Sequence, residues 1–554
     1  MPFPSPRSAI SASEQTSPPL TPTRIPTAIW VLAVAVALLN YWPYWTAARA
    51  TPEGWQFTGI THPSPDFVQY RVWMRQSQTE GPIVANRFTT ETNRAHLPVV
   101  FYYALGRVAA VTGLTPEQVM AYAGPPLAFL LVLLLYNAVR WFLPAGRARG
   151  WALFAMLFGG GLGAYLKALR DIGQRDGIAA INRLVAAPLR EGIVFEDWRG
   201  TYLITSIFES HFLLIWLLTS AAVLAFYLAV TRTSPLRIGV AALLFAAITV
   251  VHVYEGILLI LIVAGVLLLL WRRGFPVRHA LVAGAVCSMA AVGTLLALAI
   301  LQRHSGLPLP VWRGKPLFLT MFLTAYPVQV PLIILGLRRF WHEATPSDVF
   351  LLGWAGGCVT LALASPFYPW PDRGLMTLQV PLATVAAAVY FRGRGRMPPS
   401  HALAAVLLLG ATPLQVIHHL GVRMQFRATV PQRWLSPAHQ QVLATLRSTA
   451  GPEDVLAALR EDVGWLAAVF PGRHYAGHFF LTVDYERKTA ELKGLGNTAP
   501  EARARFLRDH GITMVFVNVK NQPGGYYGTP GLVPLVENNA GTLFRFTPDS
   551  SDGT

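Results

Sequence analysis

Long apolar runs alternate with short polar segments over the first three quarters of the chain. A helix needs about 20 apolar residues to cross the hydrocarbon core of a bilayer, and most of these runs come close to that length. Eleven of them are predicted to be membrane-spanning helices, at residues 27–47, 118–143, 150–168, 203–230, 236–251, 254–271, 278–301, 317–338, 347–364, 375–391 and 400–420. The run 97–113 is short and contains Gly106-Arg107, so we expect a helix lying on the membrane surface. If that run crossed the membrane as well, the count would be twelve.

The chain begins with a polar segment that is unlike the apolar runs. Residues 1–26 contain seven prolines and many Ser and Thr residues, which predicts a disordered cytoplasmic tail. The first apolar run ends in an aromatic cluster, Asn40 to Trp45, as expected at a membrane–water interface. Ala48-Arg49-Ala50 weakly resembles a signal-peptidase site, but the many later spans favour an uncleaved anchor.

The composition agrees with a membrane protein. Hydrophobic residues make up 53% of the 554 residues and charged residues only 13%, about half the usual share, which excludes a soluble enzyme as the main body. The net charge of +17 would suggest nucleic acid if the basic residues formed one binding surface. Their clearest concentration is different: twelve arginines fall within the short loops 144–149, 231–237, 272–278, 338–346 and 392–399.

Those loops all lie on one side of the membrane if there are eleven spans. The positive-inside rule then places the N-terminus in the cytoplasm and the C-terminal region outside, and we predict no nucleic-acid partner. Of the sixteen acidic residues before position 420, only Glu14, Glu343 and Asp348 fall on the inner side. We therefore expect any chemistry on the outer face of a plasma (inner) membrane.

From about residue 421 the composition becomes that of a soluble domain. Residues 455–459 and 513–519 are predicted strands, whereas 484–495 and 500–510 have the periodicity of amphipathic helices. A hairpin around 543–546 completes the pattern. The predicted fold class is thus an all-α polytopic membrane protein, residues 27–420, followed by a small extracytoplasmic α/β domain at 421–554.

The first outer loop, residues 49–117, is long for a membrane protein and rich in aromatic and polar residues. Asp66 follows a proline at a predicted helix start, where its carboxylate could cap the helix or act as a general base or metal ligand. His62 and Tyr70 flank it, and two prolines between His62 and Asp66 argue against a metal pair on one helix turn. Glu91 lies in a second polar stretch, 86–96.

Further polar groups fall where the outer ends of the spans should meet. Ionisable side chains at membrane depth normally line an interior cavity or pair with one another. His211, with Glu209, lies near the start of the span 203–230, while His252 and Glu255 occupy the outer turn between two spans. The cations Arg313, Lys315 and Arg373 occupy outer loops. Acid and imidazole groups suit deprotonation of an acceptor, and Arg or Lys suits a phosphate leaving group, although each residue taken singly also fits an ion pair or an interfacial position. The two cysteines, Cys287 and Cys358, lie in apolar runs and are expected to be buried.

This arrangement resembles the GT-C class of integral membrane glycosyltransferases, and most closely a poorly characterised group of bacterial multi-pass proteins assigned to that class. The similar stretches are short and extend over most of residues 27–520. They are Asp66 to Tyr70, Phe88 to Glu91, Leu105 to Pro116, Asp372 to Leu382, Gly477 to Lys488 and Gly511 to Val517.

The resemblance implies transfer of a sugar from a polyprenyl-phosphate carrier to an extracytoplasmic acceptor. Asp66 would be the catalytic carboxylate, and Glu91, His211, His252 and Glu255 would support acid–base chemistry or bind the acceptor, while Arg373 would contact the carrier phosphate. The commoner GT-C pattern pairs two acidic residues in the first outer loop, and Asp66 has no acidic neighbour. The use of a divalent metal is therefore left open, and so is activity itself. No metal ligands and no oligomeric state are predicted.

Two other functions remain open at this point. A transporter or flippase would be expected to show inverted repeats or paired broken helices, and neither is visible in the sequence. A non-catalytic cell-envelope scaffold, with the outer domain binding a partner, is favoured by the missing second carboxylate.

Overall fold

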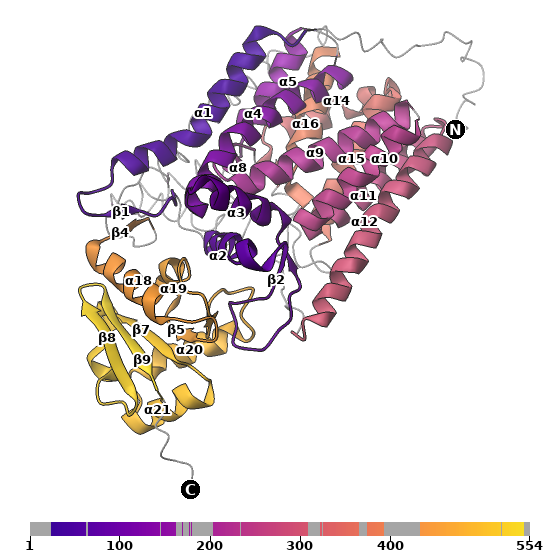
Figure 1. Ribbon diagram of the computed structural model, residues 1–554. Coiled ribbons are helices and arrows are strands. Elements are labelled where there is room, and N and C mark those ends of the chain that lie inside the picture. Colours follow the sequence, from indigo (N-terminus) through magenta and orange to yellow (C-terminus); the bar gives the residue numbers. More distant parts are fainter. Residues whose placement is uncertain are drawn as a thin grey trace, which may run out of the picture.

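The computed structural model of the chain describes residues 24–61, 65–143, 146–161, 203–232, 234–307, 325–364, 374–392, 433–521 and 523–547, with isolated residues between them. The predicted tail, apart from its last three residues, and the predicted span 400–420 lie outside these residues. The described part has two regions, a large helical bundle and a sheet-containing region at one end of it (Figure 1).

The bundle is built from α1 (Thr27–Arg49), α4 (Pro116–Phe142), α5 (Arg147–Phe158), α8 (Leu203–Ser206), α9 (Ser210–Thr231), α10 (Pro235–Val251), α11 (Val253–Arg272), α12 (Arg278–His304), α14 (Gln329–His342), α15 (Pro346–Leu363) and α16 (Gln379–Arg392). Six of these, α1, α4, α9, α11, α12 and α15, are long and apolar enough to cross a membrane. The chain is therefore a multi-pass membrane protein.

Helix starts in the bundle follow a repeated local signal. Thr115 and Thr345 each precede a proline and accept a hydrogen bond from the backbone N–H three residues later, in a reciprocal capping box with Gln118 and Asp348. Ser234 also precedes a proline and accepts a hydrogen bond from the backbone N–H of Arg237 at the start of α10, without the reciprocal bond. Proline suits the first helical position because its missing N–H would be unpaired there in any case.

Close helix packing in the bundle depends on glycine. A Cβ added at Gly353 of α15 would lie 2.6 Å from Cα of Val266 in α11, and one at Gly357 would lie as close to Ile262. Small residues let transmembrane backbones approach in this way, where apolar burial alone gives little preference for protein over lipid.

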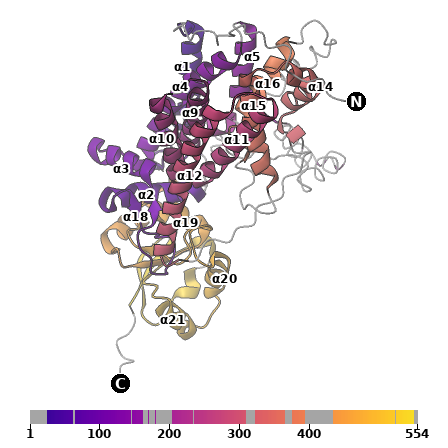
Figure 2. The ribbon, with the colours of Figure 1, turned by 90° about the vertical axis from the view of Figure 1, so that its right-hand side faces the viewer.

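At one end of the bundle, the first outer loop folds into α2 (Pro65–Glu80), the short ladder of β2 (Ile83–Val84) with β3 (Leu97–Pro98), and α3 (Val100–Thr112). Helix α3 packs on α2, and Gly106 permits this contact because a Cβ there would lie 2.4 Å from the carbonyl oxygen of Met74. Figures 1 and 2 both place α2 and α3 between the bundle and the C-terminal region.

The C-terminal region holds a five-stranded sheet in the order β6-β5-β7-β9-β8. Its strands are β5 (Val455–Ala457), β6 (Arg473–His474), β7 (Met514–Asn518), β8 (Leu532–Asn538) and β9 (Gly541–Phe546), of which β5, β6 and β7 are parallel and β8 and β9 form an antiparallel hairpin. The remaining elements are α18 (Pro437–Thr449), α19 (Arg460–Leu466), α20 (Tyr485–Leu495), α21 (Pro500–Asp509) and the 3-10 helices η3 (Val519–Asn521) and η4 (Pro523–Tyr526).

Both faces of this sheet are covered. Met514 and Phe516 of β7 pack in a core with residues of α18 and α19, whereas Val515 and Val517 pack in a second core with residues of α20 and α21. This alternation is the period of two expected of a buried strand. The strands predicted at 455–459 and 513–519 and the helices predicted at 484–495 and 500–510 are thus confirmed as elements.

The sheet region is attached to the first outer loop by main-chain hydrogen bonds. Strand β4 (Trp434–Leu435) pairs with β1 (Gln56–Phe57) just after α1. Farther along the loop, the carbonyl of Phe88 accepts hydrogen bonds from the N–H of Gly477 and the hydroxyl of Thr482. The side chain of Phe88 is fully buried in the core that includes α18 and α19, so the loop and the sheet region pack as one unit.

Candidate active site

Five of the ten predicted site residues meet at the end of the bundle that faces the sheet region. Asp66 lies in the first turn of α2, and Tyr70 lies one turn later on the same face. His211 is in the first turn of α9, and His252 lies at the junction of α10 and α11, three residues before Glu255. Four separate helices therefore bring these five residues to one place.

Ring contacts and a hydrogen bond connect α2 to α9. The ring of Tyr70 stacks on Tyr102 of α3, with centroids 4.7 Å apart and planes at 17°, and lies 5.0 Å from the ring of His211. The hydroxyl of Tyr102 is hydrogen-bonded to Nδ1 of His211 at 2.8 Å. Burial raises the pKa of Tyr102 well above its usual value, and the nearby Tyr70, Asp66 and Glu209 raise it further. Tyr102 therefore keeps its proton, and its hydroxyl can donate a hydrogen bond to Nδ1 of His211.

The chain of contacts continues from α9 to α11. The ring of His252 meets that of His211 edge-on, with centroids 5.9 Å apart. Nδ1 of His252 lies 3.4 Å from Oε1 of Glu255, which is fully buried. The result is a polar layer of phenol, imidazole and carboxylate groups, which we call the aromatic–imidazole layer: Tyr70, Tyr102, His211, His252 and Glu255. Groups of this kind can bind sugar hydroxyls and move protons.

Asp66 also has a partner from the C-terminal region. Nε2 of His478 lies 3.8 Å from Oδ1 of Asp66, and the His478 side chain is 1% exposed, whereas that of Asp66 is 34% exposed. Burial lowers the pKa of His478 more than Asp66 raises it, so this imidazole is neutral near pH 7. The backbone N–H of Phe480 donates to Nδ1 of His478, which assigns the ring proton to Nε2, the nitrogen that faces Asp66.

This tautomer gives Asp66 an N–H donor without a second charge. A donor facing a carboxylate favours its ionised form. A separation of 3.8 Å is long for a hydrogen bond, and catalytic hydrogen bonds commonly shorten when substrate binds. Asp66 thus faces a buried donor while about a third of its side chain stays exposed, as suits a general base.

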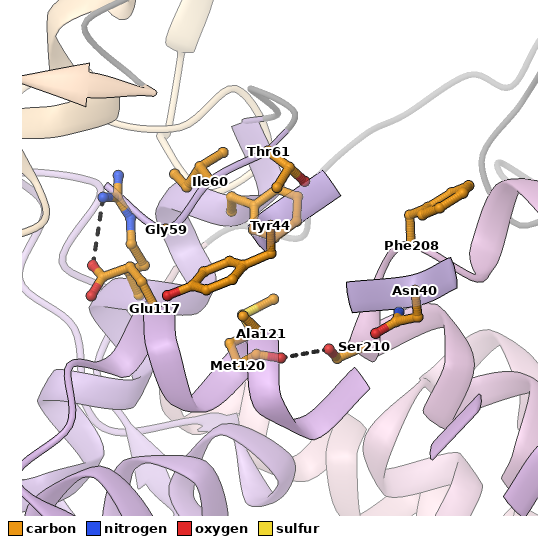
Figure 3. A pocket seen from close by; sticks show the side chains of 12 residues that line it. Asn40, Tyr44, Gly59, Ile60, Thr61, Glu117, Met120, Ala121, Phe208 and Ser210 are labelled. Carbon is orange, nitrogen blue, oxygen red and sulfur yellow. Dashed lines mark hydrogen bonds and ion pairs between the residues drawn. The ribbon is translucent and has the colours of Figure 1, made fainter. Parts of the chain in front are cut away.

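The adjacent face of α2 lines a small cavity of about 50 Å³ (Figure 3). Tyr44 and Asn40 of α1 line it, with Glu117 and Met120 of α4 and Ser210 of α9. The hydroxyl of Ser210 donates to the carbonyl of Met120 at 2.6 Å, which ties α9 to α4 beside the aromatic–imidazole layer. A space of this size holds only a few water molecules, so it is a packing feature next to the site and does not accommodate a sugar.

A buried cation on α2 supports this arrangement. Arg71 lies 3.6 Å from Glu117 and donates a hydrogen bond to the carbonyl of Gly464 at the sheet region. Burial lowers the pKa of Arg71, while Glu117 raises it. An arginine nonetheless stays charged in proteins, so α2 is fixed between α4 and α19 by a paired charge.

Glu91 lies apart from the aromatic–imidazole layer in every contact of the described residues. Its carboxylate forms an ion pair with Lys488 of α20 at 2.7 Å and accepts a hydrogen bond from Thr89. Burial raises the pKa of Glu91, but the hydrogen bonds from Lys488 and Thr89 hold it below the usual range. This geometry connects the loop to the sheet region, and the predicted catalytic role of Glu91 stays a prediction.

Four predicted residues lie outside the described part of the chain: His62, Arg313, Lys315 and Arg373. Within the described part, no three His, Cys, Asp or Glu side chains are grouped so as to hold a metal ion. The described residues therefore offer no ready ligand set for the divalent metal that the GT-C resemblance leaves open.

Two residues of the site were not proposed from the sequence. Tyr102 lies in the interrupted apolar run 97–113, where its neighbours hide a polar role. His478 lies in a stretch that carries the GT-C resemblance, and that stretch was the available signal. The sequence does not show that Tyr102 contacts His211, because the two residues are 109 positions apart.

Comparison with known proteins supports the fold. No protein-family model and no curated protein sequence matches the chain significantly. Among solved structures, the arabinofuranosyltransferase AftD from Mycobacteria matches with a TM-score of 0.55 and 14% identity, over 96% of this chain and 40% of AftD. ArnT from Cupriavidus metallidurans in its apo state matches with a TM-score of 0.50 and 12% identity, over 94% of this chain and 98% of ArnT.

At such identities the likeness concerns the fold, and the chain spans less than half the length of AftD. Both neighbours are GT-C glycosyltransferases. The chain therefore has the fold of the GT-C class of membrane glycosyltransferases, as the resemblance in its sequence predicts.

Proposed function

We propose that the protein is a membrane glycosyltransferase that moves a sugar from a polyprenyl-phosphate donor to an extracytoplasmic acceptor. The observation that carries this proposal is the position of Asp66. It is a partly exposed carboxylate at the start of α2, with the imidazole of His478 on one side and the stacked rings of Tyr70 and Tyr102 beside it. Together with the GT-C fold, this geometry suits a general base for an incoming hydroxyl.

In the proposed reaction, an acceptor hydroxyl oxygen bonds to the anomeric carbon of the donor sugar. The bond from that carbon to the phosphate oxygen breaks, and the electron pair leaves with the polyprenyl phosphate. Asp66 takes the proton of the acceptor hydroxyl. Tyr102 and His211 form a polar wall that can hold hydroxyls of either sugar.

The leaving phosphate needs a cation that is not already neutralised. Arg71 is paired with Glu117, so it does not fill this role. Arg313, Lys315 and Arg373 remain the proposed phosphate contacts, because the sequence predicts these cations in outer loops.

We also propose the orientation that the arginine-rich loops favour. The ends of the described helices that carry Arg147, Arg232, Arg272 and Arg392 lie at the opposite end of the bundle from α2, α3 and the sheet region (Figures 1 and 2). With the arginine end in the cytoplasm, eleven spans in the inner membrane leave residues 421–554 outside as an α/β domain. The acceptor is then an extracytoplasmic glycan or lipid.

The test is sugar transfer in proteoliposomes from a panel of radiolabelled polyprenyl-phosphate pentoses and hexoses. Loss of a general base typically slows a reaction by about 10²–10⁴-fold, so Asp66→Asn should lose transfer to that extent. Glu53→Gln is the matched control, because Glu53 is an exposed carboxylate in the same outer loop. Transfer by Asp66→Asn at the wild-type rate would contradict the assignment of the base. Absence of transfer by the wild-type protein, with binding of a cell-envelope partner instead, would favour the scaffold.

A further inference from the structure

The C-terminal region contains a cavity of about 500 Å³ that shares no residue with the aromatic–imidazole layer. It lies where the parallel strands β5 and β7 end, between the C-terminal end of α20 and the 3-10 helices η3 and η4. Ligands in open α/β sheets bind outside the carboxyl ends of the parallel strands, and sites for small molecules typically measure about 300–1,000 Å³. Both the position and the size fit a binding site.

The cavity has an apolar floor. Val515 and Val517 of β7 line it, together with Leu492 and Leu495 of α20 and Tyr526 of η4. All five side chains are buried, and they belong to the core of that face of the sheet. A floor of aliphatic groups and one aromatic ring matches the C–H face of a sugar ring, which is apolar although its edge carries hydroxyls.

The rim of the cavity is polar and mainly cationic. Lys493 and Lys520 are exposed at its mouth, and among the described residues neither forms an ion pair. Asn497 and Glu461 also line the rim, where an amide and a carboxylate can bind hydroxyls. Cations on the rim of a cavity this size lie within about one Debye length, roughly 10 Å at 0.1 M salt, of any ligand inside it. Lys520 also interacts electrostatically with the carboxylate of Asp462, and the acidic group of a ligand would be attracted to both lysines.

Two elements beside the cavity are joined by a part-buried hydrogen bond. Nδ2 of Asn518, at the end of β7, donates to Oδ2 of Asp462 in α19 at 2.6 Å. On the other side, the guanidinium of Arg503 lies 4.9 Å from the ring of Tyr526 and donates to the carbonyl of Leu495 at 3.1 Å. The apolar floor is therefore formed before any ligand arrives, which lowers the cost of binding.

We propose that this cavity is a second, non-catalytic site that binds an anionic sugar, with the ring on the apolar floor and the acidic group at Lys493 and Lys520. A sugar phosphate and a uronic acid share this chemistry, and the experiment separates them. The proposal does not depend on the transfer reaction at Asp66.

The test is a titration of the full chain in detergent micelles, by calorimetry or ligand-detected NMR, with glucose 1-phosphate, glucuronate, glucose and inorganic phosphate. At least one anionic sugar should bind saturably, and glucose and inorganic phosphate should each bind about tenfold more weakly, since each lacks one half of the recognised ligand. The stronger of the two anionic sugars identifies the acidic group. Absence of saturable binding for both, or equal binding of inorganic phosphate, would overturn the proposal.

Substitutions of the rim lysines test whether the sugar binds in this cavity. Lys493→Met combined with Lys520→Met should weaken binding about tenfold, because both charges lie on exposed side chains that can be lost without disturbing the core. Arg505→Met is the matched control, since Arg505 is an exposed cation on α21 that does not line the cavity. Asp66→Asn should leave the affinity unchanged. Unchanged binding in the double lysine variant, or loss of binding in Asp66→Asn, would place the sugar elsewhere and refute this site.

Discussion

Replacing His478 by phenylalanine tests whether the C-terminal region takes part in the proposed chemistry. The substitution removes the Nε2–H group that faces Asp66 at 3.8 Å but keeps an aromatic ring among Phe88, Phe479 and Phe480. His474→Phe is the matched control. His474 is also buried against Phe88, and neither of its ring nitrogens has a hydrogen-bond partner among the described residues.

The expected effect of His478→Phe on the pH–activity profile follows from the geometry of the His478–Asp66 contact. A hydrogen bond to a charged group contributes about 1.5–3 kcal/mol, and the long separation and the partial exposure of Asp66 reduce this to about 1 kcal/mol. The donor favours ionised Asp66, so its loss should move the acidic limb of the pH–activity profile upward. A difference of 1 kcal/mol corresponds to about 0.7 pH unit and to about a fivefold change in rate.

The assay is kcat/KM for sugar transfer between pH 5 and 8. His478→Phe should raise the acidic limb by about 0.7 unit, and His478→Gln should restore most of it, because the amide supplies a new N–H donor. A purely structural role for His478 would lower the yield of folded protein without moving the limb. An unchanged limb in folded His478→Phe, or the same shift in His474→Phe, would refute the reasoning.

Three further predictions concern stability, the Glu91 contact and topology. Burial lowers the pKa of His474 to about 3, so the folded state resists a proton that the unfolded chain accepts below pH 6.5. The resulting loss of stability on acidification amounts to about 2 kcal/mol at pH 5, and His474→Phe should abolish it in thermal melts at pH 5 and 7.5; an equal change at both pH values would contradict this. Glu91→Gln and Lys488→Met should each lower the free energy of unfolding by about 1–2 kcal/mol. A loss of kcat in Glu91→Gln but not in Lys488→Met would support the predicted catalytic role of Glu91, whereas unchanged kcat in both would contradict it. A cysteine placed at the exposed position Val519 should react with an impermeant maleimide added to intact cells. The two native cysteines are buried and should give no background labelling. Labelling only after lysis would contradict the proposed topology.

The apolar pattern predicts most helices but not where they break. The sequence presents residues 203–230 as one continuous span, whereas the structure divides it into α8 and α9, with Glu209 in an extended conformation between them. Mean hydropathy does not predict this break, because the single residue Glu209 barely changes the average over a long apolar run. The consequence is chemical: His211 lies in the first turn of α9, within reach of Tyr102.

The sequence predicts which side chains lie near one another only where charged residues fall at the outer ends of the spans. The grouping of acidic residues at the outer ends of the spans led to Asp66, His211, His252 and Glu255, and four helices bring these residues near one another. Nothing local to Asp66 indicates His478, because that contact depends on how the sheet region docks. The docking itself is distributed over backbone groups, such as the carbonyl of Phe88, whose partners leave no pattern in the sequence.

This distribution explains why the resemblance to the GT-C class appears as short separated stretches. The stretch Asp66 to Tyr70 supplies the carboxylate and a stacking ring, the stretch Phe88 to Glu91 contacts the sheet region, and the stretch Gly477 to Lys488 supplies both His478 and the partner of Glu91. Each stretch supplies one side of a contact between the first outer loop and the sheet region. The contact between His478 and Asp66 exists only when the sheet region is docked on the first outer loop. We infer that the C-terminal region is part of the site, and that the proposed transfer depends on its docking to the first outer loop.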